Sequence, residues 1–172
     1  MSLHRQLQQR AAEGRPIRVA LIGAGKFGSM YLAQVPRTPG VHLVGIADLS
    51  PETACRNLAR VGWDAQRVQA ANLDAALRDG NTHVGDDWRA LVRHPAIDIV
   101  VECTGNPIAA VDHCLEAFAQ GKHVVNVTVE ADAFCGPLLA RKAADAGVVY
   151  SLAFGDQPAL ICDLVDWART CG

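Results

Sequence analysis

Short apolar runs alternate along the chain with longer segments in which apolar residues recur every three or four positions. Uninterrupted apolar runs are typical of strands buried on both faces of a sheet, and the longer segments are typical of amphipathic helices. Strands that alternate with helices in units of about thirty residues predict a parallel sheet with right-handed crossovers. The predicted strands cover residues 18–22, 41–47, 82–84, 97–101, 123–129 and 148–152.

The segments between the strands carry helix signals at their ends. Proline at a first helical position, after a residue that can cap, begins the helices at Pro51 and Pro107. The predicted helices cover residues 3–13, 26–35, 51–60, 72–79, 86–93, 107–120, 131–146 and 158–170. The last of these is predicted to bury one apolar face. That face consists of Leu160, Ile161, Leu164, Val165, Trp167 and Ala168.

The first strand runs directly into the motif G-x-G-x-x-G. Its first glycine permits a tight turn, the second lets the backbone approach a pyrophosphate, and the third lets helix and strand pack closely. The diphosphate would lie against unpaired N–H groups at the positive end of the helix dipole. The motif consists of Gly23, Ala24, Gly25, Lys26, Phe27 and Gly28. It predicts dinucleotide binding by an α/β fold of the Rossmann type, a doubly wound parallel sheet with helices on both faces.

An acidic residue, Asp48, ends the second apolar run, 20 residues after Gly28, and Leu49 follows it. A carboxylate here can accept hydrogen bonds from both hydroxyls of an adenosine ribose. It also repels the extra phosphate of NADP and favours NAD. Arg56 and Arg60 on the next helix could still contact that phosphate, so the expected cofactor is NAD or NADP.

Polar and glycine-rich residues follow the buried strand at 97–101. Ligands of doubly wound sheets bind outside the carboxyl ends of the strands, so we expect these residues near the nicotinamide ribose. Asparagine before proline is also a good helix cap, and capping alone and capping with binding both stay open. The residues are Cys103, Thr104, Gly105, Asn106 and Pro107.

Three carboxylates follow the last two strands: Glu130, Asp132 and Asp156. They are the candidate catalytic residues: Glu130 and Asp132 could hold a substrate hydroxyl, a general-base water or a divalent metal, and Asp156 could contact the substrate. Alternatively, Glu130 and Asp132 stabilise the dipole of the next helix, and Asp156 caps the terminal helix. We assign no metal ligand from the sequence.

Composition narrows the classes of function. The chain has 172 residues, a formal net charge of −2 and no basic run, so nucleic acid is not an expected partner. The apolar runs are too short to span a bilayer, and the amino terminus lacks the apolar centre of a secretory signal. We therefore expect a soluble, cytoplasmic protein that does not bind membranes.

Three regions are expected along the chain. Residues 1–14 form a helical arm that packs on the domain surface or on another subunit of a homo-oligomer. Residues 15–155 form the nucleotide-binding domain. Residues 156–172 begin a helix that leads to a catalytic domain absent from this sequence, because a long apolar helix in that place normally joins two halves of a dehydrogenase.

Three motifs, at residues 20–28 (A-L-I-G-A-G-K-F-G), 101–107 (V-E-C-T-G-N-P) and 121–125 (G-K-H-V-V), carry a family resemblance. With them the chain resembles the nucleotide-binding half of the homoserine dehydrogenase-like oxidoreductases. Residues 129–132 and 155–162 resemble more narrowly a subgroup with a SAF-type C-terminal region. That subgroup includes a deoxyxylulose phosphate reductoisomerase-like enzyme.

The resemblance implies hydride transfer between NAD or NADP and a small hydroxy or keto substrate. Homoserine dehydrogenases are expected to carry a lysine at the end of the strand that follows residues 121–125, where this chain has residues 126–129 (N-V-T-V). The resemblance therefore does not name the substrate. Two alternatives stay open: a non-catalytic sensor of nucleotide or coenzyme A, and an NADPH-dependent reductoisomerase. The second would use Glu130 and Asp132 as its clustered candidates for metal ligands.

Overall fold

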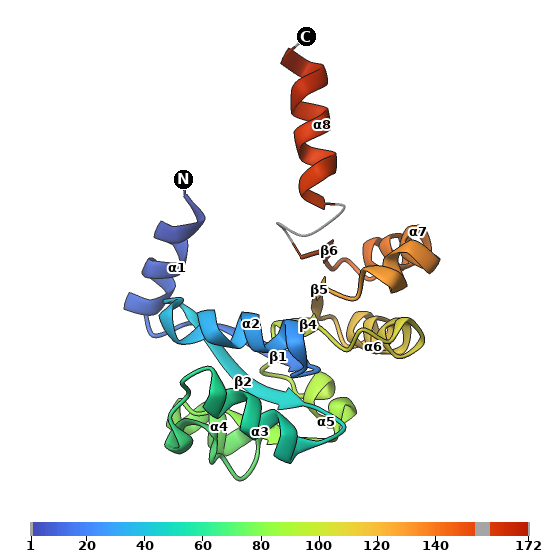
Figure 1. Ribbon diagram of the computed structural model, residues 1–172. Helices are drawn as coiled ribbons and strands as arrows, with labels where there is room; N and C mark the ends of the chain where they lie inside the picture. Colours follow the sequence, from blue (N-terminus) through green and yellow to red (C-terminus); the bar gives the residue numbers. More distant parts are fainter. Residues whose placement is uncertain (1, 154–158, 172) are drawn as a thin grey trace.

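The computed structural model describes residues 2–153 and 159–171, and its six strands form one parallel sheet (Figure 1). The strand order is β3-β2-β1-β4-β5-β6, which confirms the predicted Rossmann-type fold. The order reverses between β1 and β4, and this switch point is where doubly wound sheets bind ligands. The strands are β1 (Ile17–Ile22), β2 (Val41–Ala47), β3 (His83–Gly85), β4 (Ile99–Glu102), β5 (His123–Asn126) and β6 (Tyr150–Leu152).

Helices connect the strands, and several begin at the predicted caps. The Ser50 hydroxyl accepts the N–H of Thr53 at 3.3 Å, and the Asn106 side chain accepts those of Ile108 and Ala109. None of the helices in the described part of the chain is long and apolar enough to cross a membrane. The helices are α1 (Leu3–Ala12), α2 (Lys26–Gln34), η1 (Val35–Arg37), α3 (Pro51–Arg60), η2 (Ala65–Val68), α4 (Leu73–Asp79), α5 (Trp88–Arg93), α6 (Pro107–Ala119), α7 (Val129–Asp145) and α8 (Ala159–Cys171).

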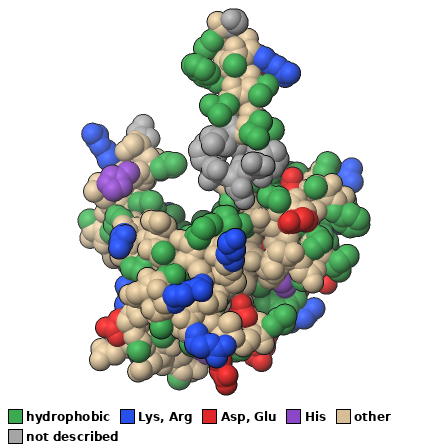
Figure 2. Space-filling view, in the orientation of Figure 1, with side chains coloured by type: hydrophobic (Ala, Val, Ile, Leu, Met, Phe, Trp, Pro, Cys, Tyr) green, Lys and Arg blue, Asp and Glu red, His purple; other side chains and the backbone are tan. Residues whose placement is uncertain are grey.

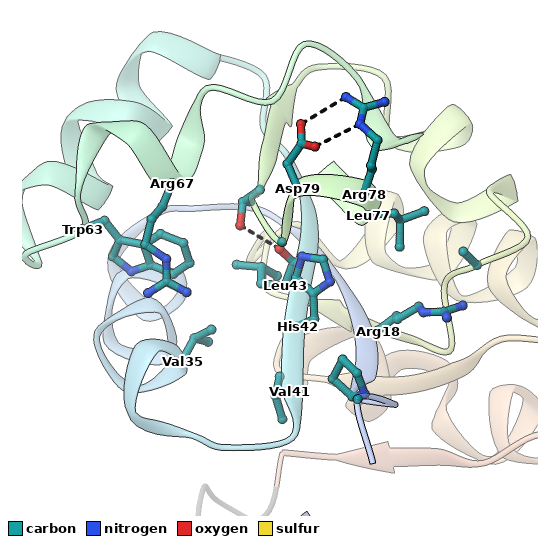
Figure 3. A pocket seen from close by; sticks show the side chains of 15 residues that line it. Arg18, Val35, Val41, His42, Leu43, Trp63, Arg67, Leu77, Arg78 and Asp79 are labelled. Atoms are coloured by element: carbon teal, nitrogen blue, oxygen red, sulfur yellow. Dashed lines mark hydrogen bonds and ion pairs between the residues drawn. The ribbon is translucent and has the colours of Figure 1, made fainter. Parts of the chain in front are cut away.

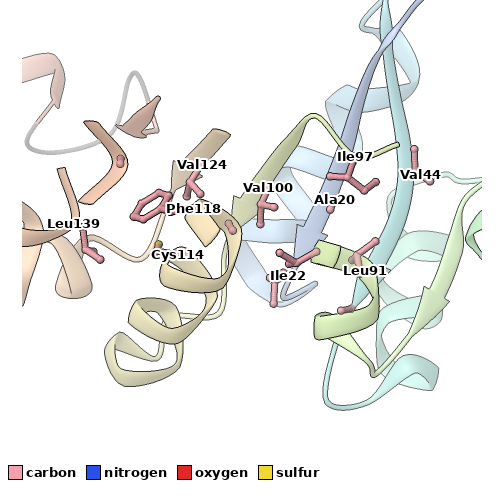
Figure 4. Packing of buried hydrophobic residues seen from close by; sticks show 14 of the residues in the cluster. Ala20, Ile22, Val44, Leu91, Ile97, Val100, Cys114, Phe118, Val124 and Leu139 are labelled. Carbon is pink, nitrogen blue, oxygen red and sulfur yellow. The ribbon is translucent and has the colours of Figure 1, made fainter. Parts of the chain in front are cut away.

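One hydrophobic cluster lies on each face of the sheet, because successive strand side chains point to opposite faces. Val19 and Leu21 of β1 belong to the cluster with α2 and α3. Ala20 and Ile22 belong to the cluster with α4, α5, α6 and α7. The second cluster is built from Val44, Leu91, Ile97, Val100, Cys114, Phe118, Val124 and Leu139, among others (Figure 4).

Lys122, in the G-K-H-V-V motif, is a buried structural residue. Its amine donates to the carbonyl oxygens of Ile97 at 2.8 Å and Pro95 at 3.4 Å. Burial lowers the pKa of this amine. A buried ammonium group needs such acceptors, so Lys122 joins the start of β5 to the turn before β4.

The strand β5 is shorter than the predicted strand at residues 123–129. It ends at Asn126, whose side-chain oxygen accepts the N–H of Thr128 at 3.1 Å. The Asn126 amide also donates to the Thr128 carbonyl at 3.1 Å. An asparagine side chain that bonds the backbone two residues on forms a turn, and this turn ends the strand early.

The helix α7 consists of two helical parts that meet at Cys135. The backbone of Cys135 is non-helical (φ −146°, ψ 22°), and Pro137 follows two residues later. Proline has no N–H to donate, and its ring clashes with the carbonyl four residues earlier. The sequence placed Pro137 inside a predicted helix, and the kink is the consequence.

The prediction that the terminal helix buries its apolar face is wrong for the described side chains. In α8, Ile161, Leu164, Val165 and Trp167 are 51%, 55%, 41% and 67% exposed. The helix stands away from the sheet, with hydrophobic side chains along its length (Figures 1 and 2). The side chain of Leu160 lies outside the described part. Periodicity identifies an apolar face, but it does not identify what covers that face.

Candidate functional site

The glycine turn between β1 and α2 is too crowded for side chains at two of its three glycines. Gly23 has φ +91°, and a Cβ there would lie 2.8 Å from the carbonyl oxygen of Cys103. A Cβ at Gly28 would lie 2.5 Å from the carbonyl oxygen of Gly23. A Cβ at Gly25 would meet nothing within 4 Å. The protein itself therefore requires Gly23 and Gly28, whereas Gly25 leaves open space beside the turn.

The amino terminus of α2 is suited to an anion. Gly25 is the N-cap residue, so no side chain caps the helix. The first N–H groups of a helix have no partner within the helix, and the helix dipole is positive at this end. Lys26, the exposed first helical residue, adds a positive charge. A phosphate group at this position would be stabilised by both features.

Asp48 holds the glycine turn from the end of β2. One carboxylate oxygen accepts the N–H of Ala24 at 2.8 Å, and the other accepts the N–H of Ser50 at 2.9 Å. On the other side, the Asn57 amide of α3 donates to the Ala24 carbonyl at 2.8 Å. The turn is therefore fixed by side chains from β2 and α3, with the carboxylate held in one orientation.

A cleft of about 490 Å³ opens at the carboxyl ends of β1, β2, β3 and β4. Several predicted residues line it, namely Gly23, Gly25, Asp48, Leu49, Cys103, Thr104 and Asn106. The remaining predicted cofactor residues lie beside these in the chain: Ala24, Lys26, Phe27 and Gly28 in the turn and α2, Gly105 in the loop before α6, and Pro107 at the first position of α6. The structure thus brings three distant sequence segments together around one cleft.

Sequence reasoning missed several residues of the cleft, among them Asp86, Trp88, Ala109 and His113. Trp88 follows β3, whose end was not considered among the candidate strand ends. His113 is on α6, and Asn106, Ala109 and His113 follow the spacing i, i+3, i+7 of one helix face, which was the available signal. The two rings pack edge to face, with centroids 4.4 Å apart.

Glu102, at the end of β4, is wholly buried and ties the loops of the cleft together. Its carboxylate accepts the N–H and the hydroxyl of Thr104, at 3.2 and 2.5 Å, and the hydroxyl of Thr128. It also lies 3.2 Å from Nδ1 of His113. The Gly105 N–H donates to the Thr128 hydroxyl at 3.0 Å, so one carboxylate joins the β4–α6 loop to the β5–α7 turn.

Two of the candidate catalytic carboxylates, Glu130 and Asp132, do not line this cleft. Glu130 and Asp132 lie in the first turn of α7, and Glu130 is exposed. Asp132 accepts the hydroxyl of Tyr150 at 3.0 Å. Asp156 lies outside the described residues. Within residues 2–153 and 159–171, no three His, Cys, Asp or Glu side chains are grouped to hold a metal ion.

A second cavity, of about 580 Å³, lies at the opposite edge of the sheet, beside the amino ends of β1 and β2 (Figure 3). Two of its arginines are engaged within the chain: Arg67 lies over the Trp63 ring at 5.3 Å, and Arg78 pairs with Asp79 at 2.9 Å. Ligands of doubly wound sheets bind at the carboxyl edge. We therefore take the 490 Å³ cleft as the candidate site.

Comparison with known proteins agrees with this geometry. The family model described as the NAD binding domain of homoserine dehydrogenase matches residues 23–151. A homoserine dehydrogenase of Methylobacillus glycogenes is 34% identical over 113 residues, which is 64% of this chain and 24% of that protein. A crystal structure of a homoserine dehydrogenase from Thiobacillus denitrificans has a TM-score of 0.62 and 25% identity, and the match covers 80% of this chain and 29% of that one.

An NAD binding oxidoreductase from Klebsiella pneumoniae has a similar fold, with a TM-score of 0.60 and 23% identity over 90% of this chain and 39% of its own. At that identity the likeness concerns the fold alone. The chain spans about a quarter of the length of the curated relative that it matches. The family model's match, residues 23–151, includes the glycine turn and the residues that line the cleft.

Proposed function

The chain belongs to the family of homoserine dehydrogenase NAD-binding domains, and on that premise we propose that it is the nucleotide-binding part of an NAD(P)-dependent oxidoreductase. The cleft at the carboxyl edge of the sheet binds the dinucleotide. Residues 15–155 are the binding domain, residues 1–14 are an arm, and residues 156–172 lead toward a part that binds a small hydroxy or keto substrate.

The observation that carries this proposal is the open space at Gly25 beside the uncapped amino terminus of α2. A diphosphate fits there, because the protein itself occupies the space beside Gly23 and Gly28 but leaves the space beside Gly25 empty. Each Asp48 oxygen accepts one backbone N–H and keeps a further lone pair. Those lone pairs suit the two hydroxyls of an adenosine ribose.

Asp48 also bears on the choice among nucleotides. Its carboxylate would repel the 2′-phosphate of NADP and the 3′-phosphate of coenzyme A, whereas the free diol of NAD has no such charge. We therefore propose NAD as the preferred ligand. A preference for coenzyme A in competition would instead favour a sensor without redox chemistry.

The bound dinucleotide supplies hydride transfer at its nicotinamide, and the residues of the chain bind and orient it. Thr104 and Asn106, in the loop held by Glu102, are the proposed contacts for the nicotinamide ribose. Glu130, Asp132 and Asp156 stay our candidates for contacts to the substrate.

Titration calorimetry with NAD and NADP tests the proposal. We expect saturable binding of NAD to the full chain and at least tenfold weaker binding to Gly25→Val, because the valine fills the diphosphate space. Gly25 has φ −71°, which a side chain tolerates, so the melting temperature should not change. Ala119→Val, an exposed site on α6, is the control. Equal affinity of Gly25→Val, or no binding of either dinucleotide up to millimolar concentrations, would refute the proposal.

A further inference from the structure

The buried carboxylate of Glu102 meets donors and no lysine or arginine. Its hydrogen-bond partners in the described part of the chain are Thr104, His113 and Thr128. A buried carboxylate is costly unless its oxygens are hydrogen-bonded, and here both are. The partners of the two threonine hydroxyls indicate which groups of this network carry the protons.

Both threonine hydroxyls donate their protons to the Glu102 carboxylate. The Thr128 hydroxyl oxygen accepts the N–H of Gly105 at 3.0 Å, and that of Thr104 accepts the N–H of Asn106 at 3.3 Å. Each hydroxyl has one proton, and Glu102 is the acceptor within reach. Glu102 is therefore an ionised acceptor, and His113 carries a proton on Nδ1 to complete the set.

His113 lines the cleft, and its other nitrogen, Nε2, is the one left for a ligand there. No hydrogen bond to it occurs among the described residues, and among those residues no fully buried side-chain nitrogen or oxygen lacks a partner. Nε2 must therefore be accessible. His113 lines the cleft beside Trp88, whose ring packs against the imidazole. With the proton held on Nδ1, Nε2 of the neutral ring is a hydrogen-bond acceptor.

We propose that Glu102 positions His113 so that Nε2 accepts a hydrogen bond from the 6-amino group of the adenine of the bound dinucleotide. The inference rests on the proposed function. Asp48, the proposed ribose contact, lines the same cleft as His113 and Trp88, so the base attached to that ribose lies within it. The 6-amino group is the donor that adenine offers to an acceptor, and the Trp88 ring gives the base an aromatic neighbour.

Replacing adenine by hypoxanthine tests this contact directly. Nicotinamide hypoxanthine dinucleotide has a carbonyl oxygen in place of the amino group, so two acceptors would face each other. We expect it to bind about fivefold to tenfold more weakly than NAD, which corresponds to one lost hydrogen bond. Equal affinity for the two dinucleotides would overturn the inference and leave the proposed function standing. If neither binds, the proposed function fails and this inference fails with it.

Variants test whether His113 causes the difference in affinity between NAD and the hypoxanthine analogue. In His113→Asn, the amide nitrogen can replace Nδ1 as donor to Glu102, while Nε2 is lost. We expect this variant to bind both dinucleotides alike. His42→Asn is the control, because His42 is a hydrogen-bonded histidine at the opposite edge of the sheet, where its Nε2 lies 2.8 Å from the carbonyl oxygen of Asn81. Discrimination that persists in His113→Asn would assign the amino group to another acceptor, such as Asp86, and overturn the inference.

Spectra of the unmodified chain test the same proposal without a substitution that could disturb folding. Nitrogen-15 spectra of the histidine rings should show the neutral His113 ring with its proton on Nδ1. The Nε2 resonance should shift when NAD is added and shift less with the hypoxanthine analogue. The opposite tautomer, or an Nε2 resonance that NAD leaves unchanged, would overturn the role proposed for Glu102 and His113.

Discussion

The carboxylate of Asp48 accepts a hydrogen bond from the backbone N–H of Ala24 at 2.8 Å, so the residue that follows β2 also holds the turn that follows β1. Its second oxygen accepts the N–H of Ser50 at the start of α3. Asp48 thus stabilises the fold and is the proposed ribose contact. A substitution here has two effects, on stability and on binding, and each needs its own measurement.

Asp48→Asn should lower both the free energy of unfolding and the affinity for NAD. One amide oxygen can still accept, but the NH₂ group then faces a backbone N–H, which should cost about 1–2 kcal/mol in the free energy of unfolding. NAD affinity should fall about tenfold, and the preference for NAD over NADP should disappear because the repelling charge is gone. Urea unfolding and calorimetry measure the two effects. Glu52→Gln removes an exposed charge one turn away and should change neither; an unchanged NAD-to-NADP ratio in Asp48→Asn would contradict the assignment.

Alanine at the first two glycines of the motif should separate structure from binding. Gly23→Ala should lower the free energy of unfolding by about 2 kcal/mol or more, because it combines a positive φ with a clash against the Cys103 carbonyl. Gly25→Ala should change it by less than about 0.5 kcal/mol, since its Cβ meets nothing. Urea unfolding of the two variants measures this difference. Equal losses of unfolding free energy would mean that the space beside Gly23 is not occupied by the Cys103 carbonyl as described.

Most of the fold could be predicted because its signals are local. The caps at Ser50 and Asn106 and the glycine turn each depend on neighbours a few residues away. The parallel order followed from alternating elements and the handedness of crossovers. The early end of β5 was missed because an asparagine within an apolar run can either continue a strand or turn the chain, and here its side chain bonds Thr128.

The cleft could be predicted only in part, because its remaining walls come from tertiary contacts. Glu102, His113 and Trp88 come from a strand end and two helices, and no local pattern shows that they meet. Glu102 stood inside a recognised motif, but only its burial identifies it as the centre of a hydrogen-bond network. The apolar face of α8 is a similar case. The spacing of its apolar residues predicted a helix face, but whether another element covers that face depends on tertiary contacts, and here the face is exposed.

Removing the charge of Glu102 should loosen the loops of the cleft. Glu102→Gln places an NH₂ group among donors and should cost about 1–3 kcal/mol in the free energy of unfolding. The N–H of Gly105, which bonds to the Thr128 hydroxyl, should then exchange with solvent faster. Hydrogen exchange and urea unfolding measure both effects. The control is Glu116→Gln, which breaks an exposed ion pair with Arg93 and should cost less than about 1 kcal/mol; a similar loss in both variants would argue against the network.

Stability should fall in alkali, because burial raises the pKa of the thiols of Cys103 and Cys114 and of the phenols of Tyr31 and Tyr150. Burial, with a smaller effect of Glu102, raises the pKa of Cys114 from 9.0 to about 12. Burial, with a smaller effect of Cys103, raises the pKa of Tyr31 from 10.0 to about 12. The unfolded chain loses these protons first, so the stabilising contribution is complete below the unfolded values and is lost as pH rises toward the folded ones.

Urea unfolding from about pH 8 to about pH 11 should therefore show a midpoint that declines above about pH 9, first through the thiols and then through the phenols as well. Tyr31→Phe keeps the ring in the hydrophobic cluster and removes the titrating hydroxyl. Its midpoint should begin to decline at the same pH as that of the unmodified chain but fall less steeply above about pH 10. Identical curves for the two proteins would show that Tyr31 ionises as readily in the folded state as in the unfolded chain, against its burial between α2 and the sheet.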